Sequence, residues 1–197
     1  MSLSARMIIV LSLVGLISGA FLAGVAKLTE ERIALNIQAE IQEAIKEVVD
    51  EAEVDQLVYE EEDFFVYREL DDENQLAGFA IQVTGVGFQD KITMMFGLDA
   101  SLKEITGLTI IDQKETPGLG AKIEDWDAFL QFWENRDATG LLTLHKPPAS
   151  SINELQPTEI NTITAATISS TKVLEIVNRS LQRVRELITQ GKIKTEE

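Results

Sequence analysis

The chain begins with one long apolar stretch. Residues 7–26 carry no charge, and a helix of this length spans about 30 Å, the thickness of the hydrocarbon core of a bilayer. The pattern predicts a single transmembrane anchor behind a short head at residues 1–6. A cleaved signal peptide is the alternative interpretation, because Gly24, Val25 and Ala26 are small enough to form a cleavage site.

The apolar periodicity continues past the uncharged stretch. Isoleucine or valine recurs every three or four residues, at Ile33, Ile37, Ile41, Ile45 and Val48. This spacing places the side chains on one face of a helix and predicts a helical neck over residues 27–49. A helix that continues out of the membrane in this way favours retention of the anchor over its cleavage.

Basic residues flank the predicted anchor on both sides, with Arg6 before it and Lys27 and Arg32 after it. The positive-inside rule therefore separates the two orientations only weakly. Because the head is short and the large domain follows the span, we expect a cytoplasmic N-terminus. The chain would then cross the cytoplasmic (inner) membrane once and place its domain on the external or periplasmic side.

Small residues form a ridge within the predicted anchor. Ser12, Gly15, Gly19 and Ala23 follow one another at spacings of three or four, and such ridges let transmembrane helices approach each other closely. The ridge indicates that the anchor docks on other membrane helices. The alternative is that these are ordinary small residues on a lipid-facing helix.

Beyond the neck, apolar strand patterns predict an antiparallel meander. Strands are expected at residues 64–68, 77–84, 92–98 and 102–111. Turn-forming residues lie between them, at positions 71–74 and 99–101.

The second half of the domain is predicted to contain two helices and one further strand. Aromatic and apolar residues recur at helical spacing over residues 124–133, which predicts a short amphipathic helix with its aromatic side chains in the core. A last strand is expected near residues 141–144. A closing helix is expected over residues 173–188, and it should stop before Gly191.

The expected fold class is α+β, with one soluble domain behind one anchor. The chain divides into a head (1–6), a transmembrane anchor (7–26), a helical neck (27–49), a domain with an antiparallel sheet and flanking helices (50–190) and a flexible tail (191–197).

Composition narrows the possible functions. The net charge is −16, from 33 acidic and 17 basic residues, which argues against nucleic-acid binding because phosphate backbones require a basic face. The chain has no cysteine, which excludes disulfides, iron–sulfur ligation and thiolate metal sites within it. Any redox cofactor must be held by other groups.

Two loops could carry chemistry. The first, at residues 115–123, contains Pro117-Gly118, which indicates a tight turn, and Gly120, which allows close approach of the backbone to another group. The second, at residues 162–171, is a dense run of hydroxyl residues before the closing helix. Hydroxyls and free amides at a helix N-terminus can hold a phosphate, although these hydroxyls could instead cap the helix.

Both loops match a known family. The motifs are KETPGLGAKI at residues 114–123, TAATISS at residues 164–170 and the turn Gly85-Val86-Gly87-Phe88. With the single anchor and helical neck, they make the chain resemble the G subunit of the Rnf ion-translocating electron-transport complex. It resembles more loosely the C subunit of the sodium-translocating NADH:quinone reductase, which shares an FMN-binding domain.

The resemblance implies a covalent flavin. In that family, a threonine of the second motif is joined to FMN by a phosphoester bond, which a separate flavin transferase installs from FAD, and the matching residue here is Thr167. By the same resemblance, the cofactor is expected to be lined by Glu115, Thr116, Gly118, Leu119, Gly120, Lys122, Thr164, Ala166, Ile168, Ser169 and Ser170. Among these, Leu119 could pack on the flavin ring and Lys122 could stabilise a reduced, anionic ring.

The chain departs from the family pattern at two positions near the acceptor. Asn161 stands where the family usually has aspartate, and Ala165 stands where it usually has glycine. Neither change removes the acceptor hydroxyl, but both alter the turn that a transferase must recognise.

The resemblance implies an electron-carrying subunit of a redox-driven ion-translocating complex, with other membrane subunits as partners and no independent substrate-converting site. One alternative is a stand-alone, membrane-anchored flavin reductase. Another is an envelope binding module without redox function, in which the hydroxyl run only caps a helix. Visible flavin would separate the two redox hypotheses from the binding module.

Overall fold

The computed structural model describes residues 2–50 and 53–194. The first residue of the expected head, residues 51 and 52 of the expected domain, and residues 195–197 of the expected tail lie outside the described part. The chain forms two compact units, Met1–Ile41 and Gln42–Glu197.

The N-terminal helix α1 (Leu3–Val48) is 46 residues long and continues through the region expected as a neck. Every residue from 7 to 26 is exposed on it, although the segment is apolar. Within the described residues, α1 is the one helix long and apolar enough to cross a bilayer. A helix that is apolar on all sides and buries none of them within its own chain is suited to lipid.

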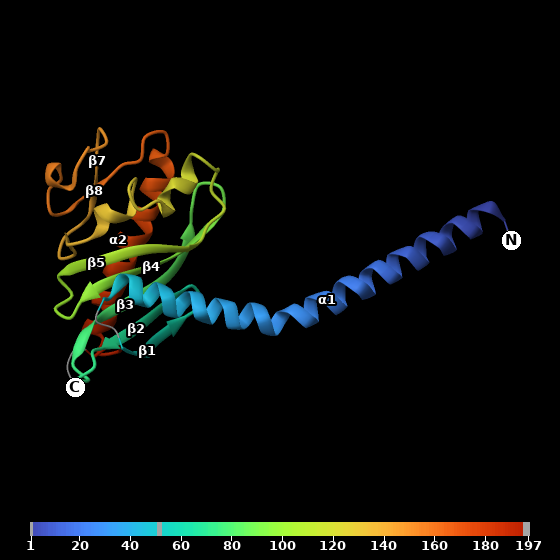
Figure 1. Cartoon of the computed structure of the whole chain (residues 1–197), viewed down its shortest axis with the longest axis horizontal. Coiled ribbons are helices and arrows are strands. Elements are labelled where there is room, and N and C mark those ends of the chain that lie inside the picture. The colour runs from blue at the N-terminus through green and yellow to red at the C-terminus, as the bar shows by residue number, and fades with distance from the viewer. Residues whose placement is uncertain (1, 51–52, 195–197) are drawn as a thin grey trace. The chain divides into compact units, whose positions relative to one another are not determined.

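The domain is built on an antiparallel sheet in the order β1-β2-β3-β4-β5-β6, and Figure 1 labels β1 to β5 of it. Its strands are β1 (Val54–Glu61), β2 (Phe64–Leu70), β3 (Leu76–Val86), β4 (Lys91–Asp99), β5 (Glu104–Asp112) and β6 (Arg136–Asp137). Each strand pairs with its neighbour in sequence, so the expected meander is confirmed. β1 was not predicted, because it is an edge strand with mostly exposed side chains and carries little apolar alternation.

The strand expected at residues 102–111 begins two residues later than predicted. The carboxylate of Asp99 accepts hydrogen bonds from the backbone N–H groups of Ser101, Lys103 and Glu104. Leu102 has a φ of 58° within this turn. The aspartate therefore extends the turn at the expense of the strand.

The prediction of an amphipathic helix at residues 124–133 is wrong. Two 3₁₀ turns, η1 (Gly120–Glu124) and η2 (Leu130–Trp133), replace it. Between them, Asp125 Oδ1 accepts the N–H of Ala128 at 2.9 Å, a side-chain bond that competes with a helical ladder. As a result Trp126 is 54% exposed, contrary to the expected core position, while Phe129 and Trp133 are buried.

A small second sheet completes the loop region. β7 (Thr143–His145) overlaps the expected strand at 141–144 but begins two residues later, and it pairs in parallel with the unpredicted β8 (Glu159–Asn161). The short η3 (Ile152–Glu154) lies between them. Three-residue strands are too short to leave a periodic signal in the sequence.

The closing helix α2 (Thr167–Thr189) covers one face of the sheet (Figure 1). It ends before Gly191, as predicted, and Gly191 adopts a φ of 67° that favours glycine. Its buried residues Val173, Val177 and Val184 belong to one core with the sheet residues Val66, Ile81, Met94 and Phe96. Together with η1 and η2, α2 supplies the expected flanking helices, and the fold is α+β.

The opposite face of the sheet receives the last turn of α1. Gly97 leaves room there, because a Cβ atom on it would collide with the carbonyl of Val48, while a Cβ on Gly78 or Gly107 would lie in ordinary contact with Val49 or Val48. Thr106 Oγ1 also donates a hydrogen bond to the carbonyl oxygen of Val48. Missing side chains on the strands thus let the helix backbone approach the sheet closely.

Candidate functional site

Three segments that are far apart in the sequence converge on the carboxylate of Glu115. Its Oε1 accepts the backbone N–H groups of Phe88 at 2.8 Å and Gln89 at 2.9 Å. Its Oε2 accepts the hydroxyl of Ser169 at 2.6 Å. The side chain is only 4% exposed. One carboxylate therefore joins the turn after β3, the loop after β5 and the first turn of α2.

Two glycines make this arrangement possible. A Cβ on Gly87 would lie 2.6 Å from Oε1 of Glu115, and a Cβ on Gly120 would lie 2.6 Å from the hydroxyl of Ser169. Both distances are far below van der Waals contact. Gly120 thus serves close approach, whereas Gly118 has a φ of 75° with open space around it and forms the turn.

Helix α2 begins at Thr167 without a side-chain cap. Its N-cap residue is Ala166, which offers no oxygen to the first amides, and no other described side chain supplies one. The interpretation that a hydroxyl side chain of this run caps the helix is therefore wrong at the N-cap position, which Ala166 occupies. The first turn keeps free N–H groups beside a threonine hydroxyl, and such groups favour an anion.

The hydroxyl groups of the second loop have different partners. Ser170 donates to the carbonyl of Ala166 at 3.1 Å and accepts the N–H of Ile163 at 3.2 Å, while Thr171 donates to the carbonyl of Thr167 at 2.7 Å. Ser169 is held by Glu115. Among the described residues, the hydroxyls of Thr164 and Thr167 make no hydrogen bond, and both are at least partly exposed.

A cavity of about 280 Å³ lies beside Thr167. Its residues come from all three converging segments: Phe88, Glu115, Thr116, Leu119, Gly120, Ala165, Ala166, Thr167, Ile168 and Ser169. Three large apolar side chains of this cavity, Phe88, Leu119 and Ile168, are about half exposed or more. A planar apolar group could rest on them while its other face stays open to solvent.

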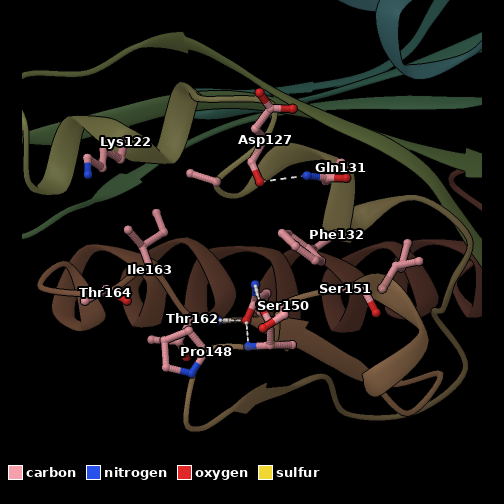
Figure 2. A pocket seen from close by; sticks show the side chains of 14 residues that line it. Lys122, Asp127, Gln131, Phe132, Pro148, Ser150, Ser151, Thr162, Ile163 and Thr164 are labelled. Carbon is pink, nitrogen blue, oxygen red and sulfur yellow. Dashed lines mark hydrogen bonds between the residues drawn. The ribbon is translucent and has the colours of Figure 1, made fainter.

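A second, larger cavity of about 490 Å³ lies between the 3₁₀ turns and the loop before β8. Figure 2 shows Lys122, Asp127 and Gln131 on one side and Ser150, Thr162 and Thr164 on the other. The amide of Gln131 is engaged, donating to the carbonyl of Asp127 at 2.6 Å.

The walls of the larger cavity contain one departure from the family pattern. Asn161 accepts the N–H groups of Ala149 at 2.7 Å and Thr162 at 3.0 Å, and it donates to the carbonyl of Ala149 at 3.1 Å. It lines the larger cavity and not the one at Thr167. Its side chain holds the loop after β7 against β8, where both amide atoms are used.

The other departure, Ala165, lies in the acceptor turn itself. Its φ is 63°, a left-handed conformation that an L residue with a Cβ adopts only at a cost. Glycine fits this conformation better than alanine. The backbone at position 165 therefore favours glycine, which is the residue that the family usually has there.

The expected site residues fall into three groups. Eight line the cavity at Thr167: Glu115, Thr116, Leu119, Gly120, Ala166, Thr167, Ile168 and Ser169. Lys122 and Thr164 line the larger cavity. Gly118 and Ser170 line neither, and Ser170 instead braces the turn from inside.

Sequence reasoning missed the contribution of the turn after β3. Phe88 lines the cavity, and the amides of Phe88 and Gln89 hold Glu115. The motif Gly85-Val86-Gly87-Phe88 marks this turn in the sequence, and its Gly87 lies against Glu115. Within residues 2–50 and 53–194, no cluster of histidine, aspartate and glutamate residues could hold a metal.

Comparison with known proteins finds similarity over this region. Residues 87–182 match the model of the FMN-binding domain, a span that includes the turn after β3, both loops and most of α2. The G subunit of the ion-translocating oxidoreductase complex of Methanosarcina acetivorans is 26% identical over 187 residues, which cover 91% of this chain and 93% of that protein.

Two further proteins are similar over shorter spans. The G subunit of the Na⁺-translocating ferredoxin:NAD⁺ oxidoreductase complex of Acetobacterium woodii is 34% identical over 102 residues, 51% of this chain and 45% of that protein. The crystal structure of the C subunit of the Na⁺-translocating NADH-quinone reductase of Parabacteroides distasonis has a TM-score of 0.51 at 23% identity. It covers 64% of this chain and 62% of that one, which supports the fold.

The resemblance that the sequence motifs indicated is therefore confirmed: residues 87–182 match the FMN-binding domain, and the chain that carries them resembles the G subunits of ion-translocating oxidoreductase complexes.

Proposed function

We propose that this chain is a membrane-anchored electron-transfer subunit of an ion-translocating oxidoreductase complex and carries FMN on Thr167. The observation that carries the proposal is the start of α2. There an accessible, unbonded hydroxyl stands at a helix N-terminus without a side-chain cap, beside a cavity with an apolar rim. The groups present fit a flavin phosphate and a flavin ring.

Attachment would make Thr167 a phosphodiester. Its Oγ1 would attack the FMN-side phosphorus of FAD, forming the threonine–phosphate bond, and the phosphoanhydride bond would break. AMP leaves with the electron pair of that bond, and the hydroxyl proton passes to it or to solvent. A separate flavin transferase would catalyse the step, since the carboxylate of Glu115, which lines the same cavity, already accepts three hydrogen bonds from protein groups.

The residues around Thr167 have complementary tasks. The free amides of the first turn of α2 and the helix dipole would stabilise the remaining negative charge of the phosphodiester. Phe88, Leu119 and Ile168 would support the apolar ring and keep part of it exposed. Thr116 and Gly120 would complete the wall of the cavity behind it.

Lys122 and Thr164 line the neighbouring larger cavity. A ring that extends past the turn at Ala165 would come under the influence of the Lys122 ammonium, whose charge favours an anionic, reduced flavin. Bound FMN supplies the ability to accept electrons in pairs or singly and to pass them on. No separate substrate site is required in this chain for that task.

The wider assignment rests on the relatives and on α1. The similar proteins are named as subunits of ion-translocating complexes, so the partners would be other membrane subunits of such a complex. α1 would hold the chain in the cytoplasmic membrane by a single pass, with the FMN-binding domain on the external side. A covalent tether suits that side, because a flavin released there would be lost by dilution.

The test is intact-mass spectrometry and in-gel flavin fluorescence of the denatured protein, purified from its native host. The expected result is a mass increment of one FMN less water, mapped to the peptide that contains Thr167. An unmodified mass without fluorescence would overturn the covalent assignment and favour the envelope binding module. Rapid oxidation of NADH by the isolated, flavin-loaded chain would favour the stand-alone reductase instead.

A further inference from the structure

The carboxylate of Glu115 is engaged by protein groups, so its main effect is on the positions of those groups. Both of its carboxylate oxygens are already occupied by protein donors, namely the amides of Phe88 and Gln89 and the hydroxyl of Ser169. The side chain is 4% exposed. A charged acceptor with three short hydrogen bonds in a buried position forms strong, directional contacts.

Two of the residues that donate to Glu115, Phe88 and Ser169, line the cavity at Thr167. Phe88 forms part of the apolar rim on the turn after β3, and Ser169 lies on the first turn of α2, two residues after Thr167. The carboxylate therefore sets the separation between the rim and the acceptor hydroxyl. Without it, no other hydrogen bond among the described residues joins the turn after β3 to α2.

The backbone around Glu115 is arranged to allow this bridge. Gly87 and Gly120 both lie against its carboxylate, at hypothetical Cβ distances of 2.6 and 2.7 Å. Its own N–H donates to Oε1 of Gln113 at 2.6 Å, which fixes the start of the side chain. The loop after β5 thus holds the carboxylate in one place.

We propose that Glu115 is the positioning residue of the flavin attachment site, holding the first turn of α2 against the turn after β3 so that the Thr167 hydroxyl is presented for modification. The inference rests on the proposed function, because it concerns the reaction at Thr167. It differs from the expectation that Glu115 only lines the cofactor. Its action is geometric, so an uncharged side chain of the same shape should replace it.

The experiment measures the rate of flavin attachment to the full-length chain in detergent, with purified flavin transferase and FAD. Four variants are compared with the wild type: Glu115→Ala, Glu115→Gln, Ser169→Ala and, as a control, Glu104→Ala. Glu104 is an exposed glutamate on β5 whose side chain makes no hydrogen bond among the described residues. Thermal unfolding of each variant reports on folding separately.

We expect Glu115→Ala to lower kcat for attachment at least tenfold while the KM for FAD stays unchanged, because FAD is bound by the transferase. Glu115→Gln should recover most of the rate, since its amide oxygen can accept the two backbone N–H groups and its NH₂ can donate to Ser169. Ser169→Ala should lower kcat severalfold. The Ser169→Ala substitution removes one of the three hydrogen bonds to Glu115. If Glu115→Ala does not fold, the rate of Ser169→Ala tests the inference instead.

Rates equal to wild type in the folded Glu115→Ala and Ser169→Ala variants would overturn the inference. A Glu115→Gln rate as low as that of Glu115→Ala would also overturn it, because charge and not geometry would then be required. Absence of any adduct on the wild type would instead overturn the proposed function. The two failures are therefore distinguishable.

Discussion

The hydroxyl of Thr106 on β5 donates a hydrogen bond to the carbonyl oxygen of Val48, the last residue of α1. This carbonyl is one of the helix C-terminal groups that have no partner within the helix. Glycines on the neighbouring strand positions leave space for the helix backbone to reach Thr106. The end of α1 is thus part of the domain's own packing.

This packing depends on Gly97 more than on Gly107. A Cβ at Gly97 would collide with Thr106 Oγ1 and the Val48 carbonyl, whereas a Cβ at Gly107 would meet its nearest atoms at 3.5 Å, ordinary contact. Gly97→Ala should lower the free energy of unfolding by about 1–3 kcal/mol through overpacking. Gly107→Ala is the matched control and should change it by less than about 0.5 kcal/mol. Urea titration of both variants checks this, and equal losses would contradict it.

Removal of the acceptor hydroxyl should abolish covalent flavin without unfolding the domain. Thr167 lies partly exposed at the start of α2, and its side chain makes no hydrogen bond within the described residues, so Thr167→Ala should cost less than about 1 kcal/mol. Fluorescence of the denatured band should disappear. Ser169 should not substitute, because its proton is already donated to Glu115.

Thr164→Ala is the control for this prediction, since Thr164 lies on the neighbouring cavity. It should retain the adduct at Thr167. Retention of flavin in Thr167→Ala together with its loss in Thr164→Ala would move the site to Thr164.

The left-handed backbone at Ala165 predicts a substitution that raises stability. At a φ of 63°, replacement by glycine relieves a cost of about 1–2 kcal/mol, which the greater entropy of unfolded glycine partly offsets. Ala165→Gly should therefore stabilise the protein by roughly 0.5 kcal/mol. Ala166→Gly, one residue later at a φ of −131° and buried, should instead destabilise it. Differential scanning calorimetry of the pair distinguishes the signs.

A buried carboxyl on β2 should make stability depend on pH. Burial, and secondarily the nearby charge of Asp55, raises the pKa of Glu69 to about 8 from an ordinary value of 4.5. The side chain is 0% exposed, and its oxygens have no hydrogen-bond partner among the described residues. The folded state therefore binds a proton that the unfolded state has lost between these two pH values.

The sign follows from that difference in bound protons. The contribution of Glu69 to stability is fully present below about pH 4.5 and is lost as the pH rises to about 8, a change on the order of a few kcal/mol. Glu69→Gln should remove this part of the slope, while Glu60→Gln, on exposed β1, should leave it. Unfolding free energies at pH 5, 7 and 9 check the difference, with an unchanged slope in Glu69→Gln as the contrary result.

The central sheet could be predicted from the sequence because β2 to β5 bury one face or both. Buried strand positions require apolar residues, which therefore recur at strand spacing. It failed where side chains override periodicity. Asp99 and Asp125 capture backbone N–H groups, delaying β5 and breaking the expected helix into two 3₁₀ turns. No hydrophobic pattern records such local bonds.

The two chemical loops could be found from composition and resemblance, but their geometry could not. Nothing in the sequence indicated that Glu115 would contact Ser169, 54 residues away, or that Gly87 would make room for it. Equally, the separation of Lys122 from the cavity at Thr167 depends on the 3₁₀ turn η1, which shares its residues with the loop motif. Long-range hydrogen bonds are set by the tertiary fold.

The start of α2 has no side-chain cap, so a bound phosphate could complete it. Under the proposed function, the phosphodiester at Thr167 would supply the acceptor atoms that Ala166 lacks, so attachment and the order of the helix end are thermodynamically linked. In the unloaded chain the first amides of α2 have no side-chain acceptor among the described residues, although Glu115 holds this turn in position through Ser169. Loading would therefore add acceptor atoms to a helix end that is already in place, and the flavin-loaded protein should resist unfolding more than the unloaded one.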